Sequence, residues 1–323
     1  MFEETNPPDI DESIVLEAVR SCLPDISDPR IKFHYHGTYN VYLVEEEYLF
    51  RFPSSILPDS EKQRLVRREA ALLERLKPHL TFEIPSPEFL NVESGYPFMG
   101  YKMISGASLT QYFESTSIKE QRFLGAQVGR FLTQLHAIDG QSLDIGEDGT
   151  YDSKDSHSEF IEVFERVQDL VYPNLEKNEI DWTDALFHDF LDFEENFNFE
   201  PVLIHGDFDT SNILVNTETF TITGILDFEE TRVYDPATDF IFLSEGYEFL
   251  SSLLNTYSGR IDPRLGDRVL FRLGRAPFIY ILWGTDNGLE SMVAYGYSAL
   301  RENILNWTKY TTIAQMCFSA QKP

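Results

Sequence analysis

The chain has 323 residues, 42% of them hydrophobic, which predicts a globular protein of about two domains. Its 54 acidic residues against 26 basic ones give a net charge of −28, which argues against a nucleic-acid partner, because phosphate binding needs clustered Lys and Arg. The chain contains no apolar run of about 18 residues, no secretory signal pattern, and only two cysteines, too few for a disulfide framework. We therefore expect a cytoplasmic protein without a membrane partner, and a monomer, since no heptad or exposed apolar stripe is evident.

The acidity is concentrated in one part of the chain. Residues 144–250 contain 28 acidic and 4 basic residues. A surface of one sign concentrates ligands of the other sign, so we expect a cationic small-molecule partner. Solubility or adaptation to high salt is the alternative explanation, but uniform adaptation would not confine the excess to one block.

The N-terminal part of the sequence predicts a helix, two strands and a second helix. Apolar residues recur at helical spacing from Ile14 to Cys22, and β-forming residues fill Tyr39–Val44 and Tyr48–Phe52. Asp59 or Ser60 can cap a helix that runs to about Lys77, where Pro78 ends it. A loop and strand region follows, and we expect Gly106 to mark a hinge after the apolar stretch 99–104.

The remainder of the chain is predicted to be mainly helical. Apolar faces at helical spacing run over residues 123–135, 160–171 and 186–197. Between these helices and the tail, residues 202–228 differ in pattern. They contain two short apolar strands, Ile213–Val215 and Ile222–Leu226, joined by a polar turn.

Three polar residues around this predicted hairpin fit the needs of phosphoryl transfer. That reaction requires a carboxylate to orient the acceptor hydroxyl, and an amide and a carboxylate oxygen to hold a divalent metal. Asp207 and Asn212 are five residues apart on a loop that enters a strand, and Asp227 follows the partner strand. We assign Asp207 as the catalytic base and Asn212 and Asp227 as Mg²⁺ ligands. His205 is expected to support the loop by a hydrogen bond.

The same motifs carry a family resemblance. His205-Gly206-Asp207 with Asn212-Ile-Leu-Val, followed by Ile225-Leu-Asp-Phe-Glu and by Asp235-Pro-Ala-Thr-Asp, resembles the aminoglycoside phosphotransferase family over roughly residues 30–300. Within that family the chain is most similar to the 2″-type enzymes. The resemblance implies an α+β, two-lobed protein-kinase-like fold, with a small β-rich nucleotide-binding lobe (residues 1–104) and a larger helical lobe (residues 105–323). It also implies ATP or GTP as the phosphate donor.

Residues of the N-terminal part are expected to bind the nucleotide. Glu69 lies on the apolar stripe of its predicted helix, and a buried carboxylate needs a partner. The kinase scheme supplies a strand lysine for this purpose; here the matching residue is Arg51, which keeps the charge but changes the geometry. An exposed strand charge for Arg51 and a solvated edge position for Glu69 are the alternatives. Thr38 could reach phosphate, and the resemblance implies that Lys102 and Ile104 contact the purine through their backbone.

Residues of the C-terminal part are expected to bind the acceptor. The resemblance implies that Trp283 forms an aromatic wall and that Glu245 and Glu248 meet substrate ammonium groups. Asp209, Glu229 and Glu230 lie beside the catalytic motifs and are further candidates, since carboxylates orient ammonium groups by charge-assisted hydrogen bonds. Each acid could instead be a solvated surface group, and Trp283 a core residue. Asp235 and Asp239 are expected to cap or brace the loop after the metal site.

The predicted function is transfer of the γ-phosphate of ATP or GTP to a hydroxyl of an aminoglycoside antibiotic, as in a resistance enzyme. Two alternatives stay open. The acceptor could be another small molecule, such as a macrolide, choline or a sugar. The protein could also be a pseudokinase that binds nucleotide without turnover; Arg51 in place of lysine favours this reading, whereas intact Asp207, Asn212 and Asp227 oppose it.

Overall fold

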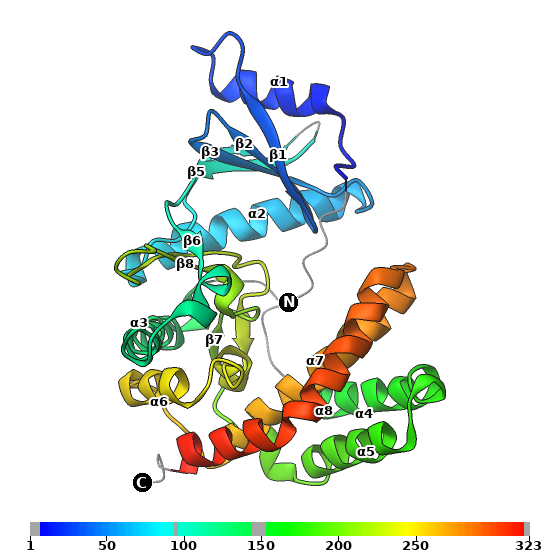
Figure 1. Ribbon diagram of the computed structural model, residues 1–323. Helices are drawn as coiled ribbons and strands as arrows, with labels where there is room; N and C mark the ends of the chain where they lie inside the picture. The colour runs from blue at the N-terminus through cyan, green and yellow to red at the C-terminus, as the bar shows by residue number, and fades with distance from the viewer. Residues whose placement is uncertain (1–6, 94–95, 144–152, 320–323) are drawn as a thin grey trace. The chain divides into compact units, whose positions relative to one another are not determined.

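The computed structural model of the protein describes residues 7–93, 96–143 and 153–319, which divide into two compact units (Figure 1). The N-terminal unit comprises the described residues up to Gln111 together with Ser211–Glu229. The C-terminal unit comprises the described residues of Tyr112–Thr210 and Glu230–Pro323. The chain therefore passes from one unit to the other after Gln111, after Thr210 and after Glu229.

An antiparallel five-stranded sheet in the order β1-β2-β3-β5-β4 forms the centre of the N-terminal unit. Its strands are β1 (Ile31–His36), β2 (Tyr39–Val44), β3 (Tyr48–Pro53), β4 (Pro87–Asn91) and β5 (Phe98–Lys102). The unit also contains helices α1 (Glu12–Cys22) and α2 (Asp59–Leu76). A second sheet, in the order β6-β8-β9, is formed by β6 (Ala107–Ser108), β8 (Ile213–Val215) and β9 (Ile222–Ile225).

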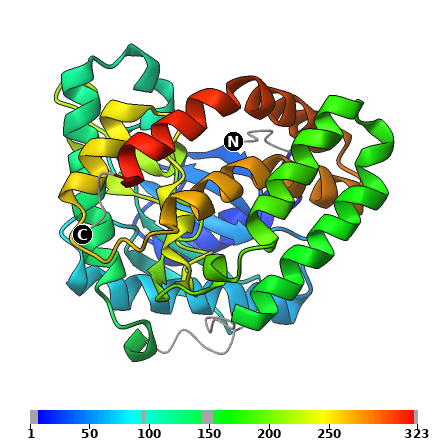
Figure 2. The same cartoon turned by 90° about the horizontal axis from the view of Figure 1, so that it is seen from below.

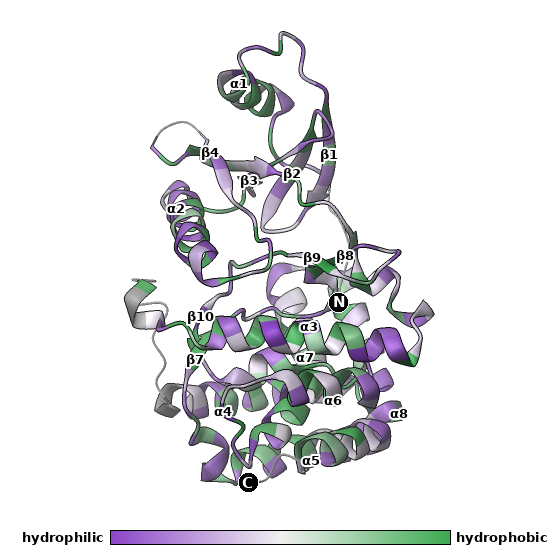
Figure 3. Cartoon of the chain, turned by 90° about the vertical axis from the view of Figure 1, so that its left-hand side faces the viewer, coloured by the Kyte–Doolittle hydropathy of each residue, from purple (hydrophilic) through white to green (hydrophobic). Residues whose placement is uncertain are grey.

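Strand β3 sends its side chains to both faces of the sheet. Phe50 and Phe52 are buried in an apolar cluster that includes Val15 and Val19 of α1. Because successive side chains of a strand point to opposite faces, Arg51 lies on the other face, which is covered by α2. Helix α2 is largely polar in Figure 3, so a narrow stripe of its residues supplies the contact with the sheet.

The β8–β9 hairpin is grouped with the N-terminal sheet rather than with the helices that follow it in the chain. Ala107 of β6 pairs with Val215 of β8, and the Ile225 N–H donates to the Glu83 carbonyl at 2.9 Å. The division of the chain therefore differs from a single cut after residue 104. The predicted metal ligands Asn212 and Asp227 are both carried by this hairpin.

The C-terminal unit is mainly helical (Figure 2). Its elements are α3 (Ile118–His136), α4 (Ser153–Leu170), α5 (Lys177–Leu191), β7 (Val202–Ile204), β10 (Arg232–Tyr234), α6 (Tyr247–Thr256), α7 (Leu265–Asn287) and α8 (Glu290–Ser319). Helix α3 packs along α6, and α7 packs along α8 beside α4 and α5. Aromatic rings fill the core between α4, α5, α7 and α8. Among them, Phe190 and Phe271 stack with ring centres 3.7 Å apart. The predicted α+β class, with a β-rich N-terminal part and a larger helical C-terminal part, is confirmed.

Within residues 7–93, 96–143 and 153–319, no helix combines the length and the apolarity that crossing a bilayer requires.

Candidate active site

Arg51 and Glu69 form an ion pair in the interior of the N-terminal unit. Arg51 is 7% exposed and Glu69 is 2% exposed. The Tyr39 hydroxyl donates to the Glu69 carboxylate at 2.8 Å, and the Tyr39 ring centre lies 4.0 Å from the guanidinium. Burial alone would lower the pKa of Arg51, but the charge of Glu69 raises this pKa well above its usual value. The arginine is therefore a fixed, permanently charged group.

Two further carboxylates face the same guanidinium. Arg51 Nη2 lies 3.8 Å from Asp227 Oδ1 and 3.6 Å from Glu229 Oε2. Both oxygens are buried and accept no hydrogen bond from the described part of the chain. Burial raises the pKa of Glu229 to about 8, and the charge of Asp227 contributes to the rise. The other Glu229 oxygen accepts a hydrogen bond from Thr38 Oγ1 at 3.2 Å. Arg51 thus faces the carboxyl groups of Glu69, Asp227 and Glu229.

Asn212 and Asp227 lie at adjacent ends of the two hairpin strands. The Leu226 N–H donates to the Asn212 carbonyl at 2.9 Å, which holds the residue before Asp227 beside Asn212. Asp227 has a φ of 66°, a left-handed conformation that residues other than glycine rarely adopt and that is found at functional sites.

These residues fit a magnesium ion. Mg²⁺ is bound through one or two carboxylates and completes its octahedral shell with phosphate oxygens and water. The buried Asp227 oxygen, which lacks a hydrogen bond, is a suitable ligand, and the Asn212 amide is a second oxygen donor. No group of three or more His, Cys, Asp or Glu residues in the described ranges forms a metal cage of its own. A metal here would depend on a nucleotide for the rest of its shell.

The segment predicted to contact a purine ring lies at the end of β5. Lys102 pairs with Tyr48 across the sheet, and its ammonium group lies 3.5 Å from the Glu47 carboxylate. The Ile104 side chain packs over Gly224 of β9, where any added side chain would collide with it. Both residues are therefore fixed in the N-terminal unit together with Arg51, and their contact with a base stays a prediction.

In the C-terminal unit, Asp239 holds the backbone of the predicted catalytic loop. Its carboxylate accepts hydrogen bonds from the His205 N–H at 2.7 Å and from the Gly206 N–H at 3.0 Å. It is fully buried and lies 3.1 Å from His136 Nε2. Burial alone would raise the pKa of Asp239, but the hydrogen bond and charge of His136 lower it, so the group stays ionised. Asp207 follows this fixed backbone and is exposed.

Gly206 cannot be replaced without disturbing the loop. Its φ is +93°, and a Cβ at this position would collide with the Glu230 carbonyl oxygen. The neighbouring His205 is fully buried, and its carbonyl accepts a hydrogen bond from Thr231 Oγ1 at 3.2 Å. The His205 backbone therefore supports the loop through two hydrogen bonds: its N–H donates to Asp239, and its carbonyl accepts from Thr231.

Two titratable groups of the C-terminal unit, Tyr280 and Glu245, are affected by the charges of Asp207 and Asp209. Burial raises the pKa of Tyr280 on α7 well above its usual value, and the charges of Asp207 and Asp209 add to the rise. Burial likewise raises the pKa of Glu245 to about 7, with a contribution from the charge of Asp209. Trp283 follows Tyr280 by three residues on α7 and is 50% exposed, so it is not a core residue.

The other predicted acceptor-site acids have different surroundings. Glu248 accepts a hydrogen bond from Arg122 Nε at 2.6 Å and is already paired. Glu230 lies 3.4 Å from Arg232 and is more than half exposed. Glu229 belongs to the N-terminal unit, beside Arg51. Within the C-terminal unit, Asp209 acts electrostatically on Glu245, whereas Glu248 and Glu230 each have an arginine partner.

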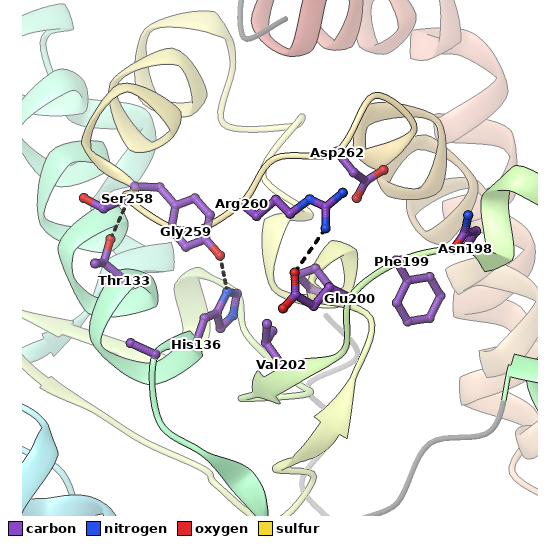
Figure 4. Close-up of a pocket in the computed structure, with 13 residues that line it drawn as sticks. Thr133, His136, Asn198, Phe199, Glu200, Val202, Ser258, Gly259, Arg260 and Asp262 are labelled. Atoms are coloured by element: carbon purple, nitrogen blue, oxygen red, sulfur yellow. Dashed lines mark hydrogen bonds and ion pairs between the residues drawn. The ribbon is translucent and has the colours of Figure 1, made fainter. Parts of the chain in front are cut away.

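A cavity of about 720 Å³ opens in the C-terminal unit at the end of α3 (Figure 4). His136 lines it and contacts the Tyr257 hydroxyl at 2.9 Å, while an ion pair of 3.2 Å joins Arg260 to Glu200 at its edge. None of the residues predicted to carry chemistry lines this cavity. The cavity is linked to the predicted catalytic loop indirectly: His136 lines the cavity and also contacts Asp239, which holds the loop.

Two residues of the site were not foreseen from the sequence. His136 is the last residue of α3, and a single histidine at the end of an apolar helical face gives no signal of its role. Arg68 Nη1 donates to the Glu229 carbonyl at 2.7 Å and thereby holds the segment after Asp227. Both contacts join residues far apart in the sequence, so only the fold reveals them.

The sequence matches the Phosphotransferase enzyme family over residues 30–277. The chain belongs to this family. The predicted phosphotransferase class and the predicted aminoglycoside phosphotransferase relationship are thereby confirmed.

Solved structures agree with the family assignment. The chain superimposes on the GDP complex of aminoglycoside 2′-phosphotransferase-IIIa with a TM-score of 0.81 and 22% identity, covering 92% of this chain and 99% of that one. The GDP and kanamycin complex of an APH(2″) enzyme gives a TM-score of 0.78 and 24% identity, with 91% and 99% covered. The macrolide 2′-phosphotransferase MphH from Brachybacterium faecium gives 0.67 and 20%, with 88% and 98% covered. These likenesses confirm the predicted kinase-like fold.

Proposed function

We propose that this phosphotransferase transfers the γ-phosphate of ATP or GTP to a hydroxyl group of an aminoglycoside, as a cytoplasmic monomer. The observation that carries the proposal is the arrangement around Asp207. An exposed carboxylate stands on a rigidly held loop, and Asp209, Glu245 and Tyr280 gather on the same unit. An acceptor with hydroxyl and ammonium groups suits these neighbours, because ionised carboxylates attract and orient ammonium groups.

The N-terminal unit would hold the phosphate donor. Arg51, fixed by Glu69, presents a permanent positive charge to the α- and β-phosphates. Thr38 is exposed in the turn between β1 and β2, where its hydroxyl and backbone could reach a phosphate oxygen. Lys102 and Ile104 would meet the base. Glu229 is better suited to this donor side than to the acceptor, since its carboxylate faces Arg51 and Thr38.

Asn212 and Asp227 would bind Mg²⁺ with the nucleotide phosphates. When bound, the ion neutralises negative charge on the phosphates. The chain's own contribution is then positional. Asp207 accepts a hydrogen bond from the acceptor hydroxyl, orients its oxygen toward the γ-phosphorus and takes up the proton. As the new O–P bond forms, the bond from the γ-phosphorus to the bridging oxygen breaks and the nucleoside diphosphate leaves. Such catalysis depends mainly on positioning and on fixed charges.

A coupled assay of nucleotide turnover tests the proposal. Mg-ATP and Mg-GTP would each be combined with kanamycin, gentamicin, a macrolide, choline and a blank without acceptor. We expect turnover with the aminoglycosides and a phosphorylated product in mass spectrometry. Turnover of nucleotide without any acceptor, or with choline alone, would contradict the proposed acceptor.

A macrolide is the second candidate acceptor, because the fold is also similar to that of a macrolide 2′-phosphotransferase. The two candidates differ in charge. The carboxyl groups of Asp209 and Glu245 suit several ammonium groups, whereas a macrolide offers a large apolar surface. Turnover confined to the macrolide would favour this alternative, and nucleotide binding without turnover of any acceptor would favour a pseudokinase.

A further inference from the structure

Arginine side chains from two elements of the C-terminal unit converge on Tyr234. Arg268, Arg272 and Arg275 follow one another on α7 at spacings of four and three, so they share one helical face. Arg232 belongs to β10, as does Tyr234. The guanidinium carbons of Arg232 and Arg272 lie 4.8 Å and 5.2 Å from the Tyr234 ring centre. This concentration of positive charge occurs in a chain whose net charge is −28.

The nearest buried carboxylate is fully used by its existing partners. Asp235 Oδ1 accepts hydrogen bonds from the Ala237 N–H at 3.0 Å and from Arg268 Nε at 3.1 Å. Asp235 Oδ2 accepts from Arg268 Nε at 3.1 Å and from Arg272 Nη2 at 2.8 Å. Asp262 binds the other end of Arg268. No acceptor capacity remains here for a further arginine.

Arg275 lacks a carboxylate partner among residues 7–93, 96–143 and 153–319. It forms no ion pair within 4.0 Å and no hydrogen bond with the residues that the structure describes, and its Nε is buried. Arg272 is 7% exposed, and its Nε also lacks a hydrogen-bond acceptor among those residues. The Arg275 guanidinium lies 4.9 Å from the Phe160 ring centre, which does not neutralise its charge. Burial and the charge of Arg272 together lower the pKa of Arg275 to about 10.

Nearby carboxylates do not complete the cluster. Glu230 forms an ion pair with Arg232 at 3.4 Å. Glu159 of α4 acts on Arg275 electrostatically but lies beyond ion-pair distance. Tyr234 and Ser156 place two hydroxyl groups at the same spot, with their oxygens 3.0 Å apart. Guanidinium N–H groups beside hydroxyl groups form the type of lining that binds phosphate.

We propose that Arg232, Arg272 and Arg275 bind a phosphate group, with Tyr234 completing the site. The group could be inorganic phosphate or the phosphate of a monoester, since both present the same oxygens. The site lies within the C-terminal unit and uses none of the residues assigned above to the donor nucleotide. It therefore stands or fails independently of the proposed function.

Thermal unfolding at constant ionic strength and pH tests this site. Inorganic phosphate or methyl phosphate would replace chloride, without nucleotide or metal. At a phosphate concentration of about ten times Kd, we expect the midpoint of the wild-type protein to rise by about 3 °C. In Arg275→Met the rise should disappear, although this variant should unfold at a higher temperature than wild type in chloride, because an unneutralised buried charge has been removed.

Arg301→Met is the matched control. Arg301 belongs to the same unit, is 57% exposed and is paired with Glu179 at 2.9 Å, so this variant should keep the phosphate effect. A rise with methyl phosphate equal to that with inorganic phosphate would identify the site as one for monoesters, and a rise with inorganic phosphate alone would identify a site for the free ion. The proposal is overturned if neither anion raises the midpoint, or if the rise persists in Arg275→Met, since phosphate would then act elsewhere.

Discussion

Arg51 of β3 and Glu69 of α2 form an ion pair in which both residues are more than nine-tenths buried. The strand and the helix are thereby joined at the point where the donor phosphates are proposed to bind. Removing one partner of such a pair destabilises the fold, because it leaves an uncompensated charge in the interior.

Replacing Arg51 by methionine should lower the free energy of unfolding by about 3 kcal/mol, because Glu69 then remains buried without its cation. The measurement is urea denaturation of the nucleotide-free protein. Arg30→Met serves as the control, because Arg30 is 70% exposed and its ion pair with Glu45 should be worth less than about 1 kcal/mol. Equal losses in the two variants would contradict the structural role assigned to Arg51.

Gly206→Ala should damage the catalytic loop, since the added Cβ meets the Glu230 carbonyl and φ is +93°. We expect a stability loss of more than about 2 kcal/mol and a clear fall in kcat. Gly288→Ala is the matched comparison: its φ is +67°, but the space around it is open, so only the conformational cost of about 1 kcal/mol should be seen. Similar losses in both variants would show that the Glu230 contact is unimportant.

Asp239→Asn should reduce kcat by about 100-fold, because the loop that carries Asp207 loses an ionised acceptor of two backbone N–H groups. Nucleotide affinity should change little, since Arg51 and Glu69 belong to the other unit. Titration calorimetry with nucleotide and steady-state kinetics separate the two effects. Asp286→Asn, at an exposed ion pair with Arg166, should leave both unchanged. A loss of nucleotide affinity without a fall in kcat would contradict the role assigned to Asp239 in holding the catalytic loop.

The acceptor KM should fall as the pH rises from 6 to 8. Burial raises the pKa of Glu245 to about 7, so its carboxyl group is mostly neutral below that pH and mostly ionised above it. Only the ionised form attracts an ammonium group strongly. In Glu245→Gln the part of the pH dependence due to this group should be lost, while the nucleotide KM stays as in wild type. An unchanged pH profile would exclude Glu245 from the acceptor site.

The local elements of this protein follow from its sequence. β-forming residues bounded by Pro53 predict β2 and β3, and the steps of four and three from Leu65 to Leu76 place Glu69 on the buried stripe of α2. Strand β1 was not predicted, because His34, His36 and Lys32 interrupt its apolar pattern. The third apolar stripe was expected to continue to Phe197, but α5 ends at Leu191 and a short 3-10 helix follows.

The candidate site was predictable where motif spacing fixes it and not where the fold assembles it. Asp207, Asn212 and Asp227 could be assigned because their spacing and the intervening hairpin define the chemistry. The grouping of the acids could not, because it depends on contacts between distant segments. Nothing in the local sequence indicates that Arg122 forms an ion pair with Glu248 or that Glu229 faces Arg51.

The most direct test of the central claim compares the wild-type protein with Asp207→Asn in the acceptor panel. We expect aminoglycoside-dependent turnover in the wild type, its loss by several orders of magnitude in Asp207→Asn, and equal nucleotide binding by the two proteins. Turnover that survives Asp207→Asn would contradict the assignment of the catalytic base and, with it, the proposed mechanism.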